Sequence, residues 1–577
     1  MLTLTFNCDG VPVFKSSKFN MWPILCSVNE LPPNIRSKHV LLCGLWFGME
    51  KPKMFSFLEP FVNECIQLSK TGLNWQDPRD DSLKNIKVYT LCGVCDSVAK
   101  PLVQNFKQFN GKYGCSLCLH PGEQVKKGCG TVRVYPHTSE IPEEREHTTT
   151  VALSEIAVRE GTDILGVKGP SPLINMPKFD LIHGMVPDYM HCVLLGVCRQ
   201  LATLWFESKY HRQPWYIGNC MREVDKFLLS IQPPSSISRT PRSITLRKYW
   251  KAHEWQTWLL YYSLPLLKDM LPTAYYSHWA LLVEGISVLL SSNLSREDIT
   301  HANEALAYFV ACVEDLYGKE HMSFNIHMLL HLAKSVTNWG PLWCHSAFVF
   351  ENCNGKLLDL VKNSKDVPLQ VCKNFLILRA LPQIAKPHLR NASAEFQLFF
   401  SRMTSTDHHI HSVEKYNGVT ALGAPKIRII SEKHYICLHT ALSTVDSSTI
   451  VKYYERIVVN EEVIHSQKYT RCVKRNNCIV MLKDKSAFKI SIFIALMTDK
   501  GQEQCYAIGR HGHCTNQTLV KRATVKTTLS YMKSVRFPLT YPLVAVDCQT
   551  IVGKCMVITC RKSNDILCQM IKIYDSK

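Results

Sequence analysis

The sequence lacks an apolar run long enough to cross a membrane. Its longest apolar stretch, from Trp279 to Leu290, contains Glu284, whereas a membrane helix needs about 20 predominantly apolar residues. The first residues, MLTLTFNCDG, also lack the charged start and continuous apolar segment of a secretory signal. We therefore expect a soluble, intracellular protein without a membrane partner.

Acidic residues are few relative to basic ones. The 577 residues include 67 Lys and Arg against 48 Asp and Glu, which gives a formal net charge of +19. This balance favours polyanionic partners such as nucleic acid or an acidic membrane surface, although a well-solvated basic surface is an alternative. The 25 cysteines, an odd number, are expected to be core residues, metal ligands or bystanders in a reducing compartment.

The N-terminal pattern predicts strands, a helix and a further strand. Apolar and polar residues alternate from Leu2 to Asp9, which predicts a strand with one buried face and Asp9 on its polar face. The other predicted elements are strands over 11–14, 22–28 and 40–47, a helix over 60–70 with Pro60 in its first turn, and a strand over 86–95. Asp96 ends that last strand, so the first strand and the strand after the helix each end in a carboxylate.

The remainder of the chain changes pattern twice, and no internal repeat is visible. From 101 to about 400 the pattern is mostly helical, with loop-like interruptions at 121–146, 161–179 and 233–247. After about residue 416, short strand-like runs predict a small β domain. The predicted fold class is therefore an α/β core interrupted by a large, mostly helical insertion and followed by a small C-terminal all-β domain. The predicted divisions are 1–110, 111–325, 326–410 and 411–577.

Asp9 and Asp96 are candidate metal ligands. Two carboxylates from neighbouring strands can share divalent cations, and Mg²⁺ prefers such hard oxygen ligands. A pair of these ions, roughly 3.5–4 Å apart, can activate a nucleophile and stabilise the leaving oxygen in phosphodiester transfer. The alternative is that both acids merely end strands, as acids do in many α/β proteins.

A Cys-x2-Cys pair and a His-x3-His pair form a second candidate metal site. Cys115 and Cys118 lie 19 residues or more after Asp96, and His327 and His331 lie on a predicted helix. Two thiolates and two imidazoles on one helical face make a tetrahedral zinc site. Buried cysteines and core histidines are the alternative reading, and His120, His321 and Cys129 are rival ligands.

Glu351 is a candidate third acid. It follows an aromatic and apolar stretch that begins at Gly340, and it lies 20 residues after His331. A helix there would return Glu351 to the two aspartates and complete a three-acid site. The alternative is an ordinary glutamate in the first turn of a helix, stabilised by the helix dipole.

Several segments together resemble the CACTA (En/Spm)-related transposases. The segments are the first-aspartate stretch 7–17 with Trp22-Pro23-Ile24, the Cys-x2-Cys run 111–118, the D-x-M-H signature at 187–191 and the distal blocks 325–343 and 350–351. The order Asp, Asp, Cys-x2-Cys, paired His and Glu also resembles the core of the RAG recombinase. The resemblance covers roughly residues 2 to 379.

The resemblance implies an RNase H-like core whose helical insertion, 111–325, is braced by zinc, with 326–410 completing the core. It implies that Asp9, Asp96 and Glu351 hold Mg²⁺ or Mn²⁺, and that Cys115, Cys118, His327 and His331 hold Zn²⁺. The implied activity is two-metal DNA strand cleavage and strand transfer in the nucleus. The implied partners are transposon ends and target DNA, with a homodimer suggested by analogy.

Two family features leave both a DNA-cutting and a non-cutting function open. Asp188 and His191 match a family signature of unknown role, and Asp188 in a first helical turn is expected to cap the helix. Asp9 lies eight residues from the start, which leaves no room for the N-terminal DNA-binding region such transposases carry. The alternative function is therefore a truncated or domesticated relative that binds DNA or chromatin without cutting it.

A basic and aromatic stretch is the candidate DNA-contact segment. It could hold phosphates and stack on an unpaired base, although a solvated loop leading into a helix explains the same composition. The candidate contacts are Arg242, Arg247, Lys248, Trp250 and Lys251.

Overall fold

The computed structural model describes residues 1–138, 140–404, 413–442, 445–498, 501–515, 529, 531–561 and 565–574. The chain divides into two compact units, here called unit 1 and unit 2. Unit 1 consists of Met1–Leu201, Leu281–Arg390 and Lys572–Lys577, and unit 2 consists of Ala202–Ala280 and Asn391–Ile571. Among the residues described, no helix has both the length and the apolarity to cross a membrane.

This division differs from the predicted one. The segment predicted as a single insertion, 111–325, contributes to both units, because the helices after Leu201 pack with the β-rich tail. Within unit 2, Arg475 Nη1 donates to the Pro234 carbonyl at 3.1 Å, and the Tyr531 hydroxyl donates to the Leu260 carbonyl at 2.8 Å. The predicted boundary between residues 410 and 411 lies outside the described residues.

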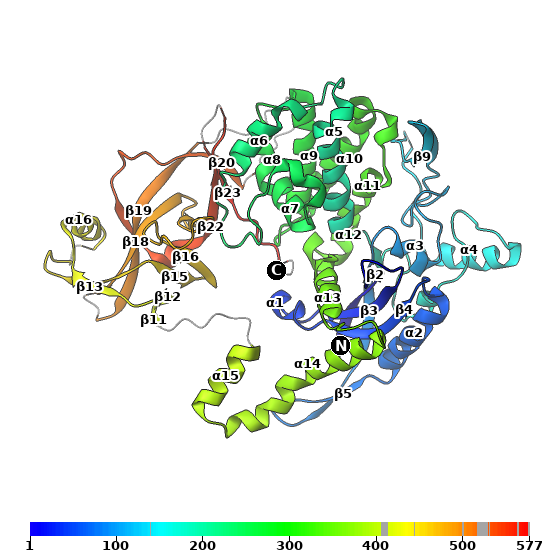
Figure 1. Cartoon of the computed structure of the whole chain (residues 1–577), viewed down its shortest axis with the longest axis horizontal. Helices are drawn as coiled ribbons and strands as arrows, with labels where there is room; N and C mark the ends of the chain where they lie inside the picture. Colours follow the sequence, from blue (N-terminus) through cyan, green and yellow to red (C-terminus); the bar gives the residue numbers. More distant parts are fainter. Residues whose placement is uncertain are drawn as a thin grey trace. The chain divides into compact units, whose positions relative to one another are not determined.

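Unit 1 is built around a six-stranded mixed sheet, drawn mainly in blue in Figure 1. Its strands are β1 (Leu2–Cys8), β2 (Val11–Pro12), β3 (Asn20–Val28), β4 (Leu41–Gly48), β7 (Val88–Val94) and β10 (Met185–Val186). The order is β10-β7-β1-β3-β2, and β4 also pairs with β3. β1 is parallel to β7, and β7 to β10, while β3 runs antiparallel to β1. The carboxyl ends of β1 and β7 therefore meet at one edge of the sheet.

The central strand β1 is buried on both faces, so the prediction of one buried face was wrong. Phe6 packs against Phe61 of α2 (Met54–Lys70), with ring centroids 5.7 Å apart. Thr5 points to the opposite face, where it lines a small pocket with Phe350 of α13 (Phe348–Asp359). The Thr5 hydroxyl donates to Asn29 Oδ1 at 2.8 Å. The buried Thr5 hydroxyl is thus satisfied by a hydrogen bond within the protein.

The helices of unit 1 cover this sheet and extend beyond it. Their bounds are α1 (Pro33–Arg36), α2 (Met54–Lys70), α3 (Ala99–Gln104), α4 (His147–Glu160), the π-helix η2 (Met190–Cys198), α10 (Arg296–Tyr317), α11 (Phe324–Met328), α12 (Leu332–Trp339), α13 (Phe348–Asp359) and α14 (Val367–Arg390). Two more helices, α5 (Arg199–Phe206) and α9 (Thr273–Leu289), contain the points where the chain passes between units.

One predicted helix start and one predicted loop in unit 1 were wrong. Pro60 lies inside α2, which begins at Met54 rather than near residue 60. The stretch 121–146 contains a hairpin of β8 (Glu123–Lys127) and β9 (Gly130–Val134), not only a loop. Gly128 supplies a positive φ of 58° at its turn, a conformation that glycine adopts without steric cost. A separate hairpin joins β5 (Leu73–Gln76) to β6 (Leu83–Ile86).

Unit 2 combines helices with two sheets. Its helices are α6 (Met221–Leu228), α7 (Ala252–Thr257), the π-helix η6 (Trp258–Tyr262), α8 (Ser263–Leu267), α15 (Ala394–Thr404) and α16 (Glu432–Ala441). One sheet contains β11 (Val413–Tyr416), β12 (Val419–Leu422), β15 (Arg456–Val459) and β16 (Glu462–His465). The other contains β13 (Lys426–Ile429), β14 (Ile450–Tyr454), β17 (Ile479–Leu482), β18 (Ala487–Met497), β19 (Glu503–Thr515), β20 (Met532–Arg536), β21 (Val544–Asp547), β22 (Ile551–Ile558) and β23 (Asp565–Gln569). The tail therefore contains its predicted strands and, in addition, α16.

Candidate functional site: an acid cluster and a Cys/His cluster in unit 1

Three elements of unit 1 deliver the three candidate acids. Asp9 follows the last residue of β1, Asp96 follows β7, and Glu351 lies in the first turn of α13. Asp96 Oδ1 accepts the backbone N–H groups of Val98 at 2.9 Å and Ala99 at 2.5 Å. Asp96 is thereby fixed at the start of α3 by hydrogen bonds to the helix backbone.

The three carboxyl groups lie close enough for the charge of Asp96 to act on both Asp9 and Glu351. Burial, followed by the charges of Asp96 and Glu351, raises the pKa of Asp9 to about 7. Burial also raises the pKa of Glu351; the charge of His191 lowers it, and the charges of Asp188 and Asp96 raise it further. Neighbouring carboxylates that oppose ionisation form a site rich in negative charge. Such a site has the charge and the oxygen ligands that divalent cations bind.

Asp188 and His191 lie beside this acid cluster. Asp188 Oδ2 accepts the ring N–H of His191 Nδ1 at 2.7 Å, and also the backbone N–H of His191 at 3.0 Å. Burial opposes protonation of His191, but the hydrogen bond and charge of Asp188, with the charges of Asp96 and Glu351, raise its pKa to about 9. The imidazole is therefore a cation at neutral pH. The sequence identified both residues but gave no role for this pair.

Asp188 also acts on the helix that carries Glu351. Its Oδ1 accepts the backbone N–H of Ala347, immediately before α13, at 2.9 Å. Its position at the start of η2 agrees with the expected capping role, because it accepts the N–H groups of Met190 and His191. The additional bond to Ala347, 159 residues away, has no signal in the local sequence.

The two cysteines and two histidines of the second candidate site come together. Their four ligand atoms all lie within 4.8 Å of one another. Cys118 Sγ lies 3.3 Å from His327 Nε2, and Cys115 Sγ lies 3.6 Å from His331 Nε2. Two sulfur and two nitrogen ligands at this separation suit tetrahedral zinc. The cluster, here called the Cys/His cluster, could hold a structural zinc ion between the segment after α3 and the helices α11 and η8 (Leu329–His331).

The rival ligands are not members of this cluster. His120 Nε2 is engaged with the Pro136 carbonyl at 2.9 Å, and its Nδ1 accepts the Gly122 N–H at 2.9 Å. Cys129 is exposed in the hairpin between β8 and β9. Among the residues described, Cys115, Cys118, His327 and His331 are the group whose ligand atoms already lie close enough together for one metal ion, and the three acids as placed do not form such a group.

Two of the predicted DNA-contact residues, Trp250 and Arg242, are engaged within unit 2. Trp250 is buried, 6% exposed, and packs against Trp255 with ring centroids 5.0 Å apart, so it is not available to stack on a base. Arg242 forms two hydrogen bonds to the carboxylate of Glu254, at 2.5 and 2.6 Å. These contacts fasten the segment to α7, and the Arg242 charge is already balanced.

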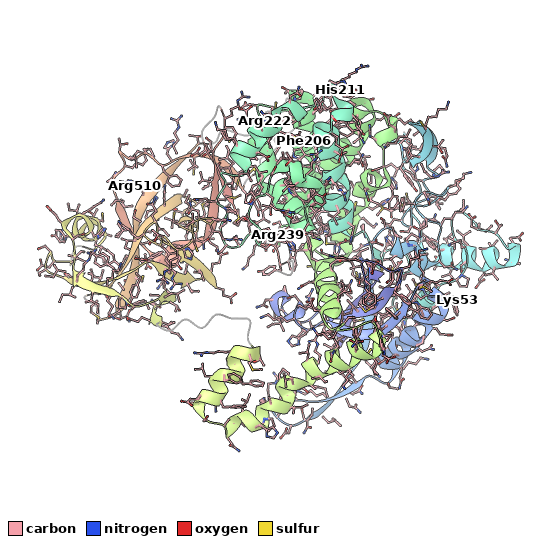
Figure 2. The ribbon with its side chains drawn as sticks, viewed as in Figure 1. Lys53, Phe206, His211, Arg222, Arg239 and Arg510 are labelled. Atoms are coloured by element: carbon pink, nitrogen blue, oxygen red, sulfur yellow. The ribbon has the colours of Figure 1, made fainter. Side chains whose placement is uncertain are left out.

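The other basic residues of this segment differ in exposure. The Arg247 guanidinium lies 5.7 Å from the ring centroid of Phe206, a residue labelled in Figure 2, and is partly buried. Lys248 and Lys251 are exposed. A role for these three residues in DNA contact stays a prediction.

The comparison with known families bears on the N-terminal part of the acid site. Residues 1–137 match the model of the transposase family tnp2. The matched segment includes Asp9, Asp96, Cys115 and Cys118. His327, His331 and Glu351 lie outside it. The match supports a transposase family, and such a family implies DNA binding and DNA transposition. The chain matches no curated protein, and the CACTA subtype and the likeness to the RAG recombinase stay predictions.

Proposed function

We propose that this protein is a DNA transposase that cleaves and joins DNA strands at the cluster of Asp9, Asp96 and Glu351. The observation that carries the proposal is the gathering of these three half-buried acids, where burial and the charges of Asp96 and Glu351 raise the pKa of Asp9 to about 7. Placing like charges side by side destabilises a fold, so the arrangement is better explained by a cationic ligand than by stability.

The sheet topology supports the same proposal. β1 and β7 are parallel neighbours, with Phe6 opposite Gly93, so the residues that follow them lie at one edge of the sheet. Ligand sites in open α/β sheets lie outside the carboxyl ends of the strands. This arrangement, with α13 supplying the third acid, supports an RNase H-like core.

Each acid has a defined task in this proposal. Asp9 and Asp96 would hold the metal ions from the sheet edge, and Glu351 would hold them from α13. Two bound Mg²⁺ or Mn²⁺ ions would supply activation of the attacking oxygen and stabilisation of the leaving oxygen. The chain contributes positioning: Asp96 is fixed by the α3 backbone, and the start of α13 is fixed by Asp188.

The substitution Asp96→Asn tests the proposal. We expect the variant to lose Mg²⁺- or Mn²⁺-dependent nicking of supercoiled plasmid DNA by at least about 100-fold, because a hard anionic metal ligand is lost. Its affinity for the same plasmid should remain, since metal-ligand carboxylates add no attraction for phosphate. The matched control is D315N, a change at an exposed aspartate on α10.

Two outcomes would contradict the proposal. Nicking that persists unchanged in D96N would exclude the assigned acids. Absence of nicking in the parent protein, together with retained DNA binding, would favour a relative that binds DNA without cutting it.

A further inference from the structure

A pocket adjoins the acid cluster within unit 1. Asp96 lines both, and residues of α3, η2 and α11 form the remaining walls. The polar lining includes Lys100, Ser116, Asp188 and His191, while Pro187 and Phe324 are among the apolar lining residues. The pocket thus offers two basic side chains, two carboxylates and an apolar surface directly beside a candidate metal ligand.

Lys100 is the first of these two basic side chains. It lies on α3 one turn after Asp96, its side chain is buried, and its residue exposure is 5%. Among the residues described, its ammonium group has no hydrogen-bond partner. A buried charge without a partner costs several kcal/mol, on the order of the desolvation penalty of one ion. An anion in the pocket would offset this cost.

His191 is the second basic side chain. Its Nδ1 is fixed by Asp188 at 2.7 Å, while its side chain keeps 25% of its exposure. Nε2 has no hydrogen-bond partner among the described residues, so a ligand in the pocket can contact it. The Asp188 bond fixes the ring orientation, and a fixed donor costs little entropy when a ligand binds.

We propose that this pocket binds a phosphate group of the DNA backbone, with His191 and Lys100 as the groups that contact the phosphate oxygens. The proposal rests on the proposed DNA-cleaving function, and it adds a site for the phosphate next to the one that reacts. Apolar side chains beside the basic groups favour a phosphodiester, whose sugar carbons can pack against them, over free inorganic phosphate.

The methyl group of Met328 provides a local probe of this pocket. Met328 lines the pocket and is 4% exposed. The full chain would be labelled at its 17 methionine methyl groups, and the Met328 resonance assigned by the substitution M328L. The ligand is the thymidine dinucleotide TpT, which carries one phosphodiester charge, and its neutral methylphosphonate analogue is the matched ligand control. Met49, which is 64% exposed, is the control resonance.

We expect TpT to shift the Met328 resonance saturably and to leave Met49 unchanged. The methylphosphonate analogue should bind about tenfold more weakly, because charge-assisted hydrogen bonds are roughly twice as strong as neutral ones. H191Q and K100M should each weaken TpT binding at least about fivefold. The control variants H211Q and K53M change exposed residues at the surface (Figure 2) and should bind like the parent.

The two proposals fail in distinguishable ways. Equal affinity for TpT and its neutral analogue in the parent protein would overturn the phosphate pocket, even if K100M or H191Q failed to fold. So would an unresponsive Met328 resonance in a parent that nicks DNA and loses this activity in D96N. Charge-dependent TpT binding through His191 and Lys100, in a parent that never nicks DNA, would support the pocket and reject the cleavage function.

Discussion

The carboxylate of Asp188 accepts the backbone N–H of Ala347 at 2.9 Å, directly before the helix that carries Glu351. The substitution Asp188→Ala removes this bond and the bonds to Met190 and His191, and leaves these donors without their acceptor. We expect it to lower the free energy of unfolding by at least about 3 kcal/mol, since hydrogen bonds to charged groups contribute about 1.5–3 kcal/mol each. It should also slow single-turnover nicking at least about tenfold.

The variant D188N separates the two contacts. Its amide oxygen can still accept the Ala347 N–H, but its charge beside His191 is gone. Nicking by D188N should therefore fall less than nicking by D188A. Equal rates in both variants would show that the Ala347 bond does not position Glu351.

His191 makes stability depend on pH. Its folded-state pKa is raised to about 9, whereas the unfolded value lies near 6.5. A raised pKa means that the charged imidazole stabilises the fold fully below pH 6.5, and that this contribution is lost as the pH rises through 9. In buffer without divalent cations, the parent should exceed H191Q by about 2–3 kcal/mol at pH 6.

The difference between the parent and H191Q should shrink steadily between pH 6.5 and 9, as measured by urea unfolding at several pH values. H211Q, a change at an exposed histidine, should follow the parent throughout. A difference between the parent and H191Q that does not change with pH would show that the imidazole is not charged in the folded protein.

The Cys/His cluster predicts one zinc ion per chain. C118S should lose the metal and several kcal/mol of stability, because structural zinc binding contributes directly to folding. Metal content by plasma mass spectrometry and thermal unfolding measure the two effects. C129S, at an exposed cysteine, should keep both the zinc and the stability of the parent. Full zinc content in C118S would reject the assigned ligands.

Trp250 should behave as a core residue. W250A is expected to cost about 3–5 kcal/mol of folding free energy, as large-to-small aromatic substitutions in cores do. Y249A changes the neighbouring aromatic residue, which is 60% exposed, and should cost under about 1 kcal/mol. Urea unfolding measures both. A W250A variant that keeps its stability but binds DNA more weakly would instead support the prediction that Trp250 contacts DNA.

The strand-end acids could be predicted because strand patterns are local. Asp9 and Asp96 each follow an apolar, strand-like run, and parallel pairing of those two runs places them at one edge. The Cys-x2-Cys and His-x3-His spacings are also local patterns, and their members converge in the structure. The position of Glu351 near the aspartates required the family resemblance, because no local pattern specifies how α13 packs.

Contacts between segments far apart in the chain could not be predicted from local sequence patterns. Alternation in β1 predicted a solvated face, whereas α13 covers that face and Asn29 satisfies Thr5. The sequence predicts Arg242 as a phosphate contact, but in the structure Arg242 pairs with Glu254 on the next helix. Nothing in the local sequence indicates this pairing. The burial of Lys100 could not be predicted from the sequence, because a lysine is ordinarily exposed. Only the packing of α3, η2 and α11 buries it.

The most direct test of the central claim is a crystal structure of the protein soaked with Mn²⁺, with the ions located by anomalous scattering. We predict Mn²⁺ bound by carboxylate oxygens of Asp9, Asp96 and Glu351. Mn²⁺ at other positions only, with the three carboxyl groups pointing apart, would contradict the account.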